Sequence, residues 1–324
     1  MGSPKVSIVI PTLNAGFGFE ALLEGLCTQR TDFDYEIVVL DSGSTDGTAE
    51  LALRYGASVY RVSRAEFDHG GTRNLGISLS EGEYVTLIVQ DAVPLDERWL
   101  AAMVEDLDQD GLIAGVYGRQ VPRSGCSPLT RVLVNGWATA DLERREQFVN
   151  DPELYRALSP KERWLLATFD NVSSCLRRSV WEKIPFERTN FGEDLRWGKM
   201  VVEEGYKLVY EPRSAVFHSH ERGVAYDLRR HYVDQLVLLD LFELALVPNS
   251  MLLLLGILRS FADLYRRLLR SENTKGVAPR LALLAARYAV SSQVGTYLGA
   301  KNRRLAEVSP RLSARLDHFL SRNI

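Results

Sequence analysis

The stretch "YVTLIVQDAVP", Tyr84 to Pro94, predicts a buried strand that ends in a carboxylate. Its apolar and β-branched residues do not alternate with polar ones, which is typical of a parallel strand covered on both faces. Asp91 follows this run. Because open α/β sheets bind ligands at the carboxyl ends of their strands, Asp91 is a candidate ligand-binding residue. The alternative is that Asp91 only caps the turn before Pro94.

Three earlier stretches, "KVSIVIPT", "YEIVVLDS" and "SVYRVS", also read as strands. Strands and helical patterns alternate, with helices expected at 19–29, 46–55, 72–79 and 96–107. This βαβ alternation predicts an α/β fold with a mostly parallel sheet flanked by helices. Right-handed crossovers would bring the strand ends at Thr12, Asp41 and Asp91 to one edge, which argues against a mere capping role for Asp91.

The size of the chain, 324 residues, exceeds the usual limit of a single hydrophobic core. Its composition, 46% hydrophobic and 25% charged, is that of a globular protein. The three cysteines lack metal-type spacing, which favours reduced thiols over a zinc site. The start "MGSPKVSIVIPT" lacks the features of a signal peptide, so a cytoplasmic location is expected, with no nucleic-acid partner.

The rhythm of strands and helices changes after residue 121, and 128–165 reads as helical or irregular. "NVSSCLRRSVWEKIPF" then predicts a strand and a short helix, "GEDLRWGKMVVEEG" a helix closed by Gly205, and "YKLVYEPRSAVFHSH" a strand. From Tyr226 the pattern is helical, broken by Pro248 and by a loop at "SENTKGVAP". We therefore expect two domains, 1–225 and 226–324.

A dinucleotide-binding interpretation rests on "GFGFEA" at 16–21, which matches G-x-G-x-x-A. We reject it because Pro11 fixes an extended exit from the first strand, so the glycines come too late for the tight turn. Small residues follow Asp41 and leave room for a flat ring. The Asp41 carboxylate could accept a hydrogen bond from the imide N–H of uracil or thymine.

Five stretches together resemble the inverting family 2 glycosyltransferases, which have the GT-A fold: "VSIVIPTLN", "LDSGSTDGT", "GTRNLGISLSEGEYV", "QDAVP" and "FGEDLRWGKMVVEEGYKLVYEP". The resemblance implies that Asp41 binds the nucleobase. The same donor pocket would contain Pro11, Thr12, Asn14, Ser44 and Gln90. "QDAVP" stands where the family has D-x-D, so Asp91 matches its last carboxylate and Val89 replaces the first.

The leaving group of a sugar-nucleotide donor is a nucleoside diphosphate. Stabilising its negative charge needs a divalent cation, Mg²⁺ or Mn²⁺, or basic side chains. "FHSH" offers His218 and His220, of which we expect only one to face the diphosphate. The resemblance favours Asp91 with His218 as the metal ligands and His220 as the alternate. The alternative is that both are ordinary surface or core histidines.

"FDHGGTRNLG" adds His69 and Arg73 to the expected donor site, with paired glycines that would let the backbone approach a ligand closely. The guanidinium of Arg73 could pair with the diphosphate in a fork geometry, as the resemblance implies. The alternative is a solvated helix residue.

Inversion needs one general base on the acceptor side, and the family's acidic motif corresponds to Glu193 and Asp194 in "GED". Adjacent helical residues point about 100° apart, so only one can face the acceptor. The resemblance assigns Asp194 as the base. The alternative is that both acids merely stabilise the start of a helix.

Within the family, "HGGTRN", "QDAVP", "NVSSCLRRSVWEKIPF" and "HSH" resemble bacterial rhamnosyltransferases that build surface polysaccharides from dTDP-L-rhamnose. This implies a saccharide or lipid-linked saccharide as acceptor. The alternatives are another donor, such as a UDP-hexose, or a non-catalytic nucleotide-sugar-binding protein. A binding module needs no base, so Asp194 argues against the latter.

The C-terminal segment 226–324 carries 15 basic and 8 acidic residues, a net charge of +7, whereas 1–225 carries 24 and 34, a net charge of −10. Its longest apolar run, "MLLLLGIL", is too short to span a bilayer. A leucine-rich helix with basic residues predicts peripheral contact with the inner face of the cell membrane. The alternative is a helical core or a homo-oligomer interface.

Overall fold

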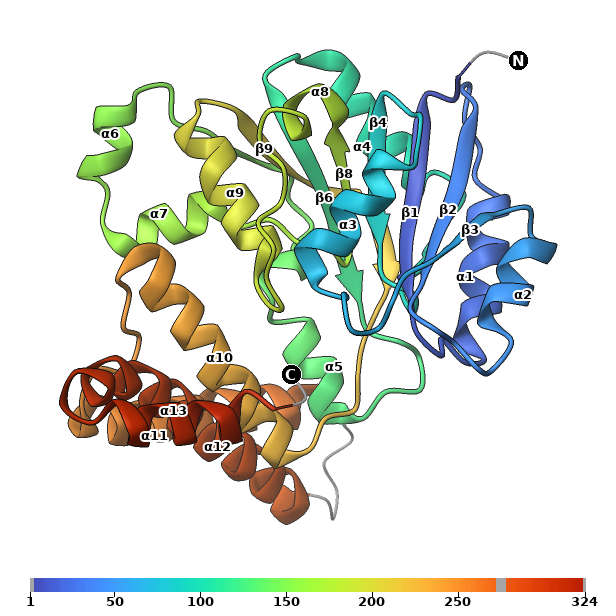
Figure 1. Cartoon of the computed structure of the whole chain (residues 1–324). Helices are drawn as coiled ribbons and strands as arrows, with labels where there is room; N and C mark the ends of the chain where they lie inside the picture. Colours follow the sequence, from blue (N-terminus) through green and yellow to red (C-terminus); the bar gives the residue numbers. More distant parts are fainter. Residues whose placement is uncertain (1–2, 272–277, 323–324) are drawn as a thin grey trace. The chain divides into compact units, whose positions relative to one another are not determined.

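The structure, a computed structural model, describes residues 3–271 and 278–322 (Figure 1). The loop expected at "SENTKGVAP" therefore lies mostly outside the described residues. The chain forms two compact units. The sheet unit comprises Met1–Val121 and Trp137–His218, and the helical unit comprises Pro122–Gly136 and Ser219–Ile324. This division differs from the expected one at residue 225, because Pro122–Gly136 joins the C-terminal helices.

The described part of the sheet unit contains nine strands in one sheet, in the order β3-β2-β1-β4-β8-β6-β9-β5, with β7 also paired to β9. The first four expected strands are parallel neighbours, as predicted. They are β1 (Val6–Thr12), β2 (Tyr35–Asp41), β3 (Ser58–Arg61) and β4 (Tyr84–Ile88). The βαβ reading of the N-terminal half is thereby confirmed.

An antiparallel strand enters the sheet beside β4. β8 (Ser173–Arg177) pairs antiparallel with both β4 and β6 (Ile113–Val121). β6 runs parallel to β9 (Lys207–Phe217), which also pairs antiparallel with β5 (Val93–Pro94) and β7 (Arg145–Gln147). Because β8 is antiparallel, its first residues lie at the same edge as the last residues of β4.

The sheet is covered on both faces, which explains why its strands are apolar throughout. Along β1, Ile8 and Ile10 belong to one hydrophobic core and Val9 to the other. The first core includes residues of α1 (Gly18–Cys27), α2 (Thr48–Arg54) and α4 (Trp99–Gln109). The second includes residues of α3 (His69–Ser78), α8 (Arg178–Trp181) and α9 (Glu193–Glu203). Shorter helices complete the unit: η1 (Ala138–Ala140), α6 (Pro152–Ala157) and α7 (Pro160–Ala167).

Helix α9 ends as its sequence predicts. Gly205 follows the last turn with a φ of +79°, a left-handed conformation that favours glycine at a helix end. The chain then enters β9 directly. The amino end of α9 carries Glu193 and Asp194, so the helix holds both acids at one end of a rigid element.

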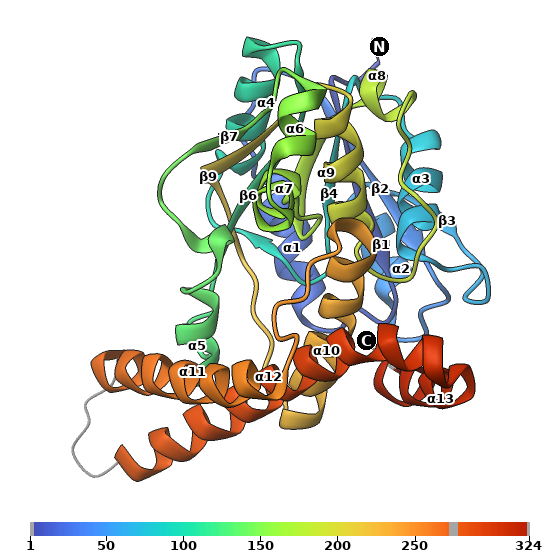
Figure 2. The same ribbon diagram turned by 90° about the vertical axis from the view of Figure 1, so that its left-hand side faces the viewer.

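The helical unit consists of α5 (Pro128–Val134), α10 (Val224–Phe242), α11 (Ser250–Ser271), α12 (Ala278–Val308) and α13 (Pro310–Leu320). α11 and α12 pack side by side (Figure 2). α12 also packs closely on α10, because a Cβ at Gly295 would come within 2.2 Å of the Leu228 carbonyl oxygen. Among the described residues, no helix is long and apolar enough to span a membrane.

Candidate active site

The carboxyl edge of the sheet gathers most of the predicted site residues. β1 ends at Thr12 and β2 at Asp41, and these two residues are register partners. β4 ends at Ile88, opposite Ser173 at the start of β8. The segments after β1, β2 and β4 and the segment before β8 therefore meet at this edge.

Asp41 lies buried at the end of β2, with its carboxylate already held by three donors. The Thr12 hydroxyl lies 3.2 Å from Oδ1, and the Gly43 and Ser44 amides donate to Oδ2 at 3.2 and 3.0 Å. An ionised carboxylate offers about four acceptor positions, so one remains. The one remaining acceptor position of the Asp41 carboxylate could take the single N–H donor of an imide.

The loop after β1 is fixed in place beside Asp41. Asn14 adopts a φ of +47°, and its amide donates to the Ser44 hydroxyl at 2.8 Å. Gln90 accepts from the Leu13 amide at 2.8 Å and donates to the Leu13 carbonyl at 3.3 Å. Gln90 therefore holds this loop to the end of β4, and Pro11 lies half-buried within β1 itself.

Asp91 and His218 come together because β5 pairs with β9. Val93 lies opposite Phe217, which brings the preceding Asp91 beside the following His218. The Asp91 Oδ1 and His218 Nε2 atoms are 3.8 Å apart. His218 is buried and Asp91 is partly exposed, so the pair has one open side.

The expectation that only one of His218 and His220 faces the diphosphate does not follow from strand geometry, because residues two apart on an extended chain point to the same face. Asp91 and His218 both belong to the sheet unit, whereas His220 belongs to the helical unit. A carboxylate suits Mg²⁺ and Mn²⁺, whereas imidazole suits transition metals. Asp91 and His218 together offer donors that fit a divalent cation.

Glu193 forms a buried ion pair with Arg73 from α3. Their side chains are 7% and 6% exposed, and Arg73 Nη1 lies 3.0 Å from Glu193 Oε1. Arg73 also donates to the His69 carbonyl at 3.2 Å, and Asn171 Nδ2 donates to Glu193 at 3.2 Å. Burial alone would raise the pKa of Glu193, but the positive charge of Arg73 lowers it overall.

Arg73 is therefore not the solvated helix residue of the alternative interpretation. Its contact with a diphosphate stays a prediction, since in this structure its guanidinium pairs with Glu193. His69 lies beside it, with Nδ1 3.3 Å from Arg73 Nη1. Because arginine only donates, this nitrogen of His69 is the acceptor.

Asp194 has the opposite electrostatic environment. Its Oδ1 accepts from the Leu195 amide at 2.8 Å and its Oδ2 from the Asn171 amide at 3.4 Å. Burial, followed by the negative charges of Glu193 and Asp170, raises the pKa of Asp194 to about 8. Two neighbouring acids with pKa values pushed apart are typical of an acid–base site.

Sequence reasoning missed three polar residues at this edge: Gln120, Asp170 and Asn171. Asp170 and Asn171 precede β8, and their position follows only once β8 is known to be antiparallel. Gln120 lies near the end of β6, where it donates to Asp170 at 2.5 Å and contacts His218 at 2.8 Å. The signal in the sequence was "FDN" immediately before a strand.

Gly70, the first of the paired glycines at the start of α3, allows close packing against a neighbouring backbone segment. A Cβ at Gly70 would come within 1.8 Å of the Glu187 carbonyl oxygen. The adjacent His69 amide donates to the Thr189 carbonyl at 3.0 Å. Gly70 thus lets α3 contact the segment that leads into α9.

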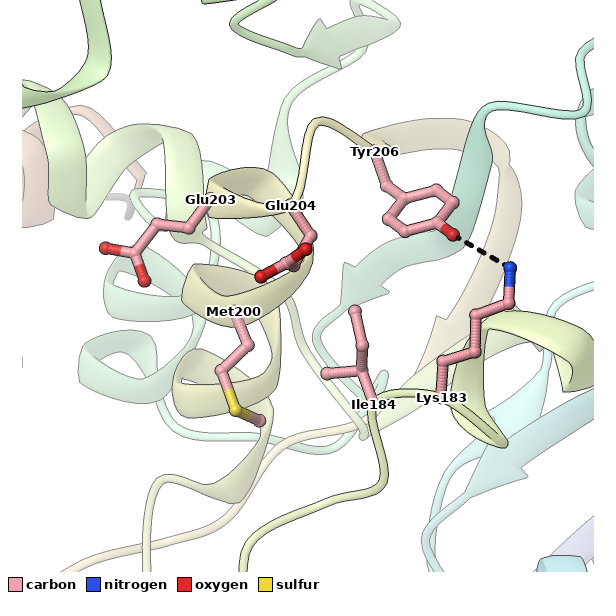
Figure 3. Close-up of a pocket in the computed structure, with 6 residues that line it drawn as sticks. All are labelled: Lys183, Ile184, Met200, Glu203, Glu204 and Tyr206. Carbon is pink, nitrogen blue, oxygen red and sulfur yellow. Dashed lines mark hydrogen bonds between the residues drawn. The ribbon is translucent and has the colours of Figure 1, made fainter. Parts of the chain in front are cut away.

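Two pockets lie at the other end of α9, about 15 Å from its acidic start by helix rise. One has a volume of ≈360 Å³ and is shown in Figure 3. It is lined by Lys183, Ile184, Met200, Glu203, Glu204 and Tyr206. Its neighbour, of ≈310 Å³, shares Glu203 and Glu204. Neither pocket contains any of the predicted site residues, so the carboxyl edge remains the candidate active site.

A mostly parallel sheet whose carboxyl edge carries a buried carboxylate, a carboxylate–imidazole pair and two adjacent acids with opposed pKa shifts is typical of an enzyme. The model of glycosyl transferase family 2 matches residues 7–179, more than half of the chain. The chain therefore belongs to glycosyl transferase family 2 and is a glycosyltransferase.

Relatives with named activities extend over most of the chain. An O-antigen chain rhamnosyltransferase of Salmonella typhimurium, RfbN, is 28% identical over 234 residues, covering 70% of each chain. A second, WbaN of Salmonella anatum, is 28% identical over 233 residues, covering 71% of this chain and 70% of its own.

Solved structures share the fold at lower identity. A mannosyltransferase of Pyrobaculum calidifontis in complex with GDP-Man and Mn²⁺ has a TM-score of 0.52 and 20% identity, covering 98% of this chain and 79% of its own. The glucosyl-3-phosphoglycerate synthase of Mycobacterium tuberculosis with Mn²⁺ and UDP has a TM-score of 0.51 and 19% identity, covering 76% and 82%. These neighbours establish the GT-A fold.

Proposed function

We propose that this glycosyltransferase moves L-rhamnose from dTDP-L-rhamnose to a hydroxyl group of a saccharide or lipid-linked saccharide during surface polysaccharide synthesis. The observation that carries the proposal is the similarity to two O-antigen chain rhamnosyltransferases over about 70% of the chain. The main alternative is a different donor, because structural neighbours hold GDP-Man or UDP-Glc on the same fold.

On the donor side, Asp41 would accept the imide N–H of thymine in its remaining acceptor position. Thr12 and the backbone amides of residues 43 and 44 fix the carboxylate, so it is oriented before the donor arrives. Asp91 and His218 would hold a divalent cation, with His220 as the alternate ligand. When bound, such a cation stabilises the negative charge that develops on the departing diphosphate.

On the acceptor side, Asp194 would take the proton of the attacking hydroxyl group. As the new bond from that oxygen to the anomeric carbon forms, the bond from the anomeric carbon to the diphosphate breaks. The nucleoside diphosphate carries away the electron pair, and the configuration inverts. A positioned general base contributes about 10²- to 10⁴-fold to such a step.

We also propose that the helical unit contacts a membrane surface through α11. The first turns of this helix expose a set of large apolar side chains, with Met251 68%, Leu254 60% and Leu258 56% exposed. Arg259, Arg266 and Arg270 are exposed farther along the helix. Apolar side chains that insert, next to arginines that attract anionic headgroups, are typical of an interfacial helix. A homo-oligomer interface is the competing use of the same face.

A donor panel tests the proposed activity. dTDP-L-rhamnose, UDP-glucose and GDP-mannose would be compared by thermal shift with Mn²⁺ present, since a ligand at 100 times its Kd stabilises by about 2.7 kcal/mol. We expect dTDP-L-rhamnose to give the largest shift. A larger shift with either of the other donors would overturn the choice of sugar nucleotide.

Donor turnover without acceptor separates an enzyme from a binding module. We expect slow release of dTDP from dTDP-L-rhamnose by the wild-type protein and at least about 10²-fold less by Asp194→Asn. Tight donor binding with no release, with or without saccharide acceptors, would instead favour the non-catalytic alternative.

A further inference from the structure

Gln120 connects the proposed metal ligand His218 to Asp170 beside the base. All three side chains belong to the sheet unit, and Gln120 and His218 are buried. Gln120 Oε1 lies 2.8 Å from His218 Nδ1, and Gln120 Nε2 donates to Asp170 Oδ2 at 2.5 Å. The other oxygen of Asp170 accepts from the Val172 amide at 2.9 Å.

The orientation of the Gln120 amide follows from its partners. A carboxylate can only accept hydrogen bonds, so the amide nitrogen of Gln120 must face Asp170. Its carbonyl oxygen then faces His218, and that oxygen can only accept. Nδ1 of His218 must therefore carry a hydrogen, which leaves the lone pair of the neutral ring on Nε2, the atom that faces Asp91.

We propose that Gln120 is a positioning residue that holds His218 in the Nδ1–H tautomer and so presents Nε2 to a divalent cation shared with Asp91. A free imidazole side chain prefers the other tautomer, with the hydrogen on Nε2, which could not bind a cation there. Partners of this kind typically contribute about 10- to 100-fold to metal affinity. The inference rests on the proposed metal site, but the tautomer itself needs no metal.

The competing explanation is that Gln120 only fills space or only holds Asp170. Two substitutions separate these roles. Gln120→Leu keeps much of the volume and removes both hydrogen bonds. Gln120→Glu keeps an oxygen that accepts from His218 Nδ1–H, but it cannot donate to Asp170 and repels it.

The first measurement is the ring-nitrogen NMR spectrum of the metal-free protein, with the His218 signals assigned by their loss in His218→Ala. We expect the Nδ1–H pattern in the wild type and in Gln120→Glu, and a shift to the Nε2–H pattern in Gln120→Leu. An Nε2–H pattern in the wild type, or an unchanged pattern in Gln120→Leu, would overturn the proposal.

The second measurement is Mn²⁺ affinity, followed by the electron paramagnetic resonance signal of free Mn²⁺. We expect at least about 10-fold weaker binding for Gln120→Leu than for Gln120→Glu. Equal losses in the two variants would assign Gln120 to packing or to Asp170 instead. If the wild type binds no Mn²⁺, the proposed metal site fails, and the NMR result still decides the role of Gln120. Circular dichroism checks that each variant folds.

Discussion

Replacing Asp194 by Asn should inactivate the enzyme and stabilise its fold at the same time. The substitution keeps the shape and an oxygen that can accept from the Leu195 amide, a contact of 2.8 Å in the wild type. It removes the basicity, so transfer should fall by at least about 10²-fold while donor affinity changes little. Near-normal turnover would refute the assignment of the base.

The stability effect follows from the pKa of Asp194, which is raised to about 8 by burial and by Glu193 and Asp170. The ordinary pKa of this carboxyl group is 3.8, so between these two pH values the folded state binds a proton that the unfolded state has lost. Folding stability from this group is therefore lost as the pH rises through that window. The slope is about 1.4 kcal/mol per pH unit.

At pH 7 this cost reaches at most about 4 kcal/mol, the product of that slope and the distance of pH 7 from the unfolded pKa. The neutral amide in Asp194→Asn carries no such cost. Urea unfolding of both proteins between pH 5 and 8 should show the advantage of Asp194→Asn increasing with pH. A difference in unfolding free energy between the two proteins that stays constant with pH would refute the raised pKa of Asp194.

Asp110→Asn provides a control of opposite sign. The hydrogen bond from Lys207 lowers the pKa of Asp110, so its contribution to stability is present above the unfolded pKa and lost as the pH falls. Asp110→Asn should therefore destabilise the folded protein at neutral pH.

The pH profile of the wild-type enzyme offers a further test. Its kcat/KM should rise about tenfold per pH unit below about pH 8, where Asp194 gains its proton.

Further substitutions test the rest of the site. Asp41→Ala should weaken dTDP binding by about 1 to 3 kcal/mol in calorimetry, and unchanged affinity would remove Asp41 from the nucleobase pocket. Asp91→Ala should abolish activity and Mn²⁺-dependent nucleotide binding, whereas full wild-type activity in excess chelator would contradict a metal role. Glu193→Gln leaves the Arg73 charge buried without its partner and should cost about 3 to 5 kcal/mol in urea unfolding; a loss below about 1 kcal/mol would show that the ion pair is not needed. The full chain should float with anionic liposomes and detach as salt increases, and Leu254→Ser with Leu258→Ser should reduce flotation while Leu112→Ser, an exposed leucine of the sheet unit, should not. Concentration-dependent dimerisation lost in the same double variant, without flotation, would favour the oligomer interface.

The periodic parts of the fold could be predicted because local pattern determines them. The four N-terminal strands, their helices and the end of α9 at Gly205 follow from residues close in sequence. The convergence of Thr12 and Asp41 also followed, because parallel strands share an edge. The antiparallel direction of β8 within the sheet could not be predicted, because the sequence of an isolated strand carries no signal for its direction.

Contacts between distant segments could not be predicted. Arg73 and Glu193 are separated by 120 positions, and neither "GTRN" nor "GED" indicates that the two charges meet. The histidines illustrate a different failure. Side chains alternate between faces along an extended chain, so residues two apart share a face, and the rule gives no basis for expecting only one of His218 and His220 at the diphosphate.

Adjacent acids at the start of one helix are not equivalent as bases, and Arg73 makes the difference. A Glu193 base would have to take up a proton while its carboxylate lies 3.0 Å from a buried guanidinium, which lowers its proton affinity. For Asp194 the effect of Arg73 is outweighed by burial and by the ionised Glu193, which both increase its proton affinity. Because a stronger base removes a hydroxyl proton more readily, the charge that Arg73 fixes on Glu193 strengthens Asp194. Glu193→Gln should therefore shift the acid limb of kcat/KM to lower pH, and an unshifted limb would mean that the two carboxyl groups do not interact.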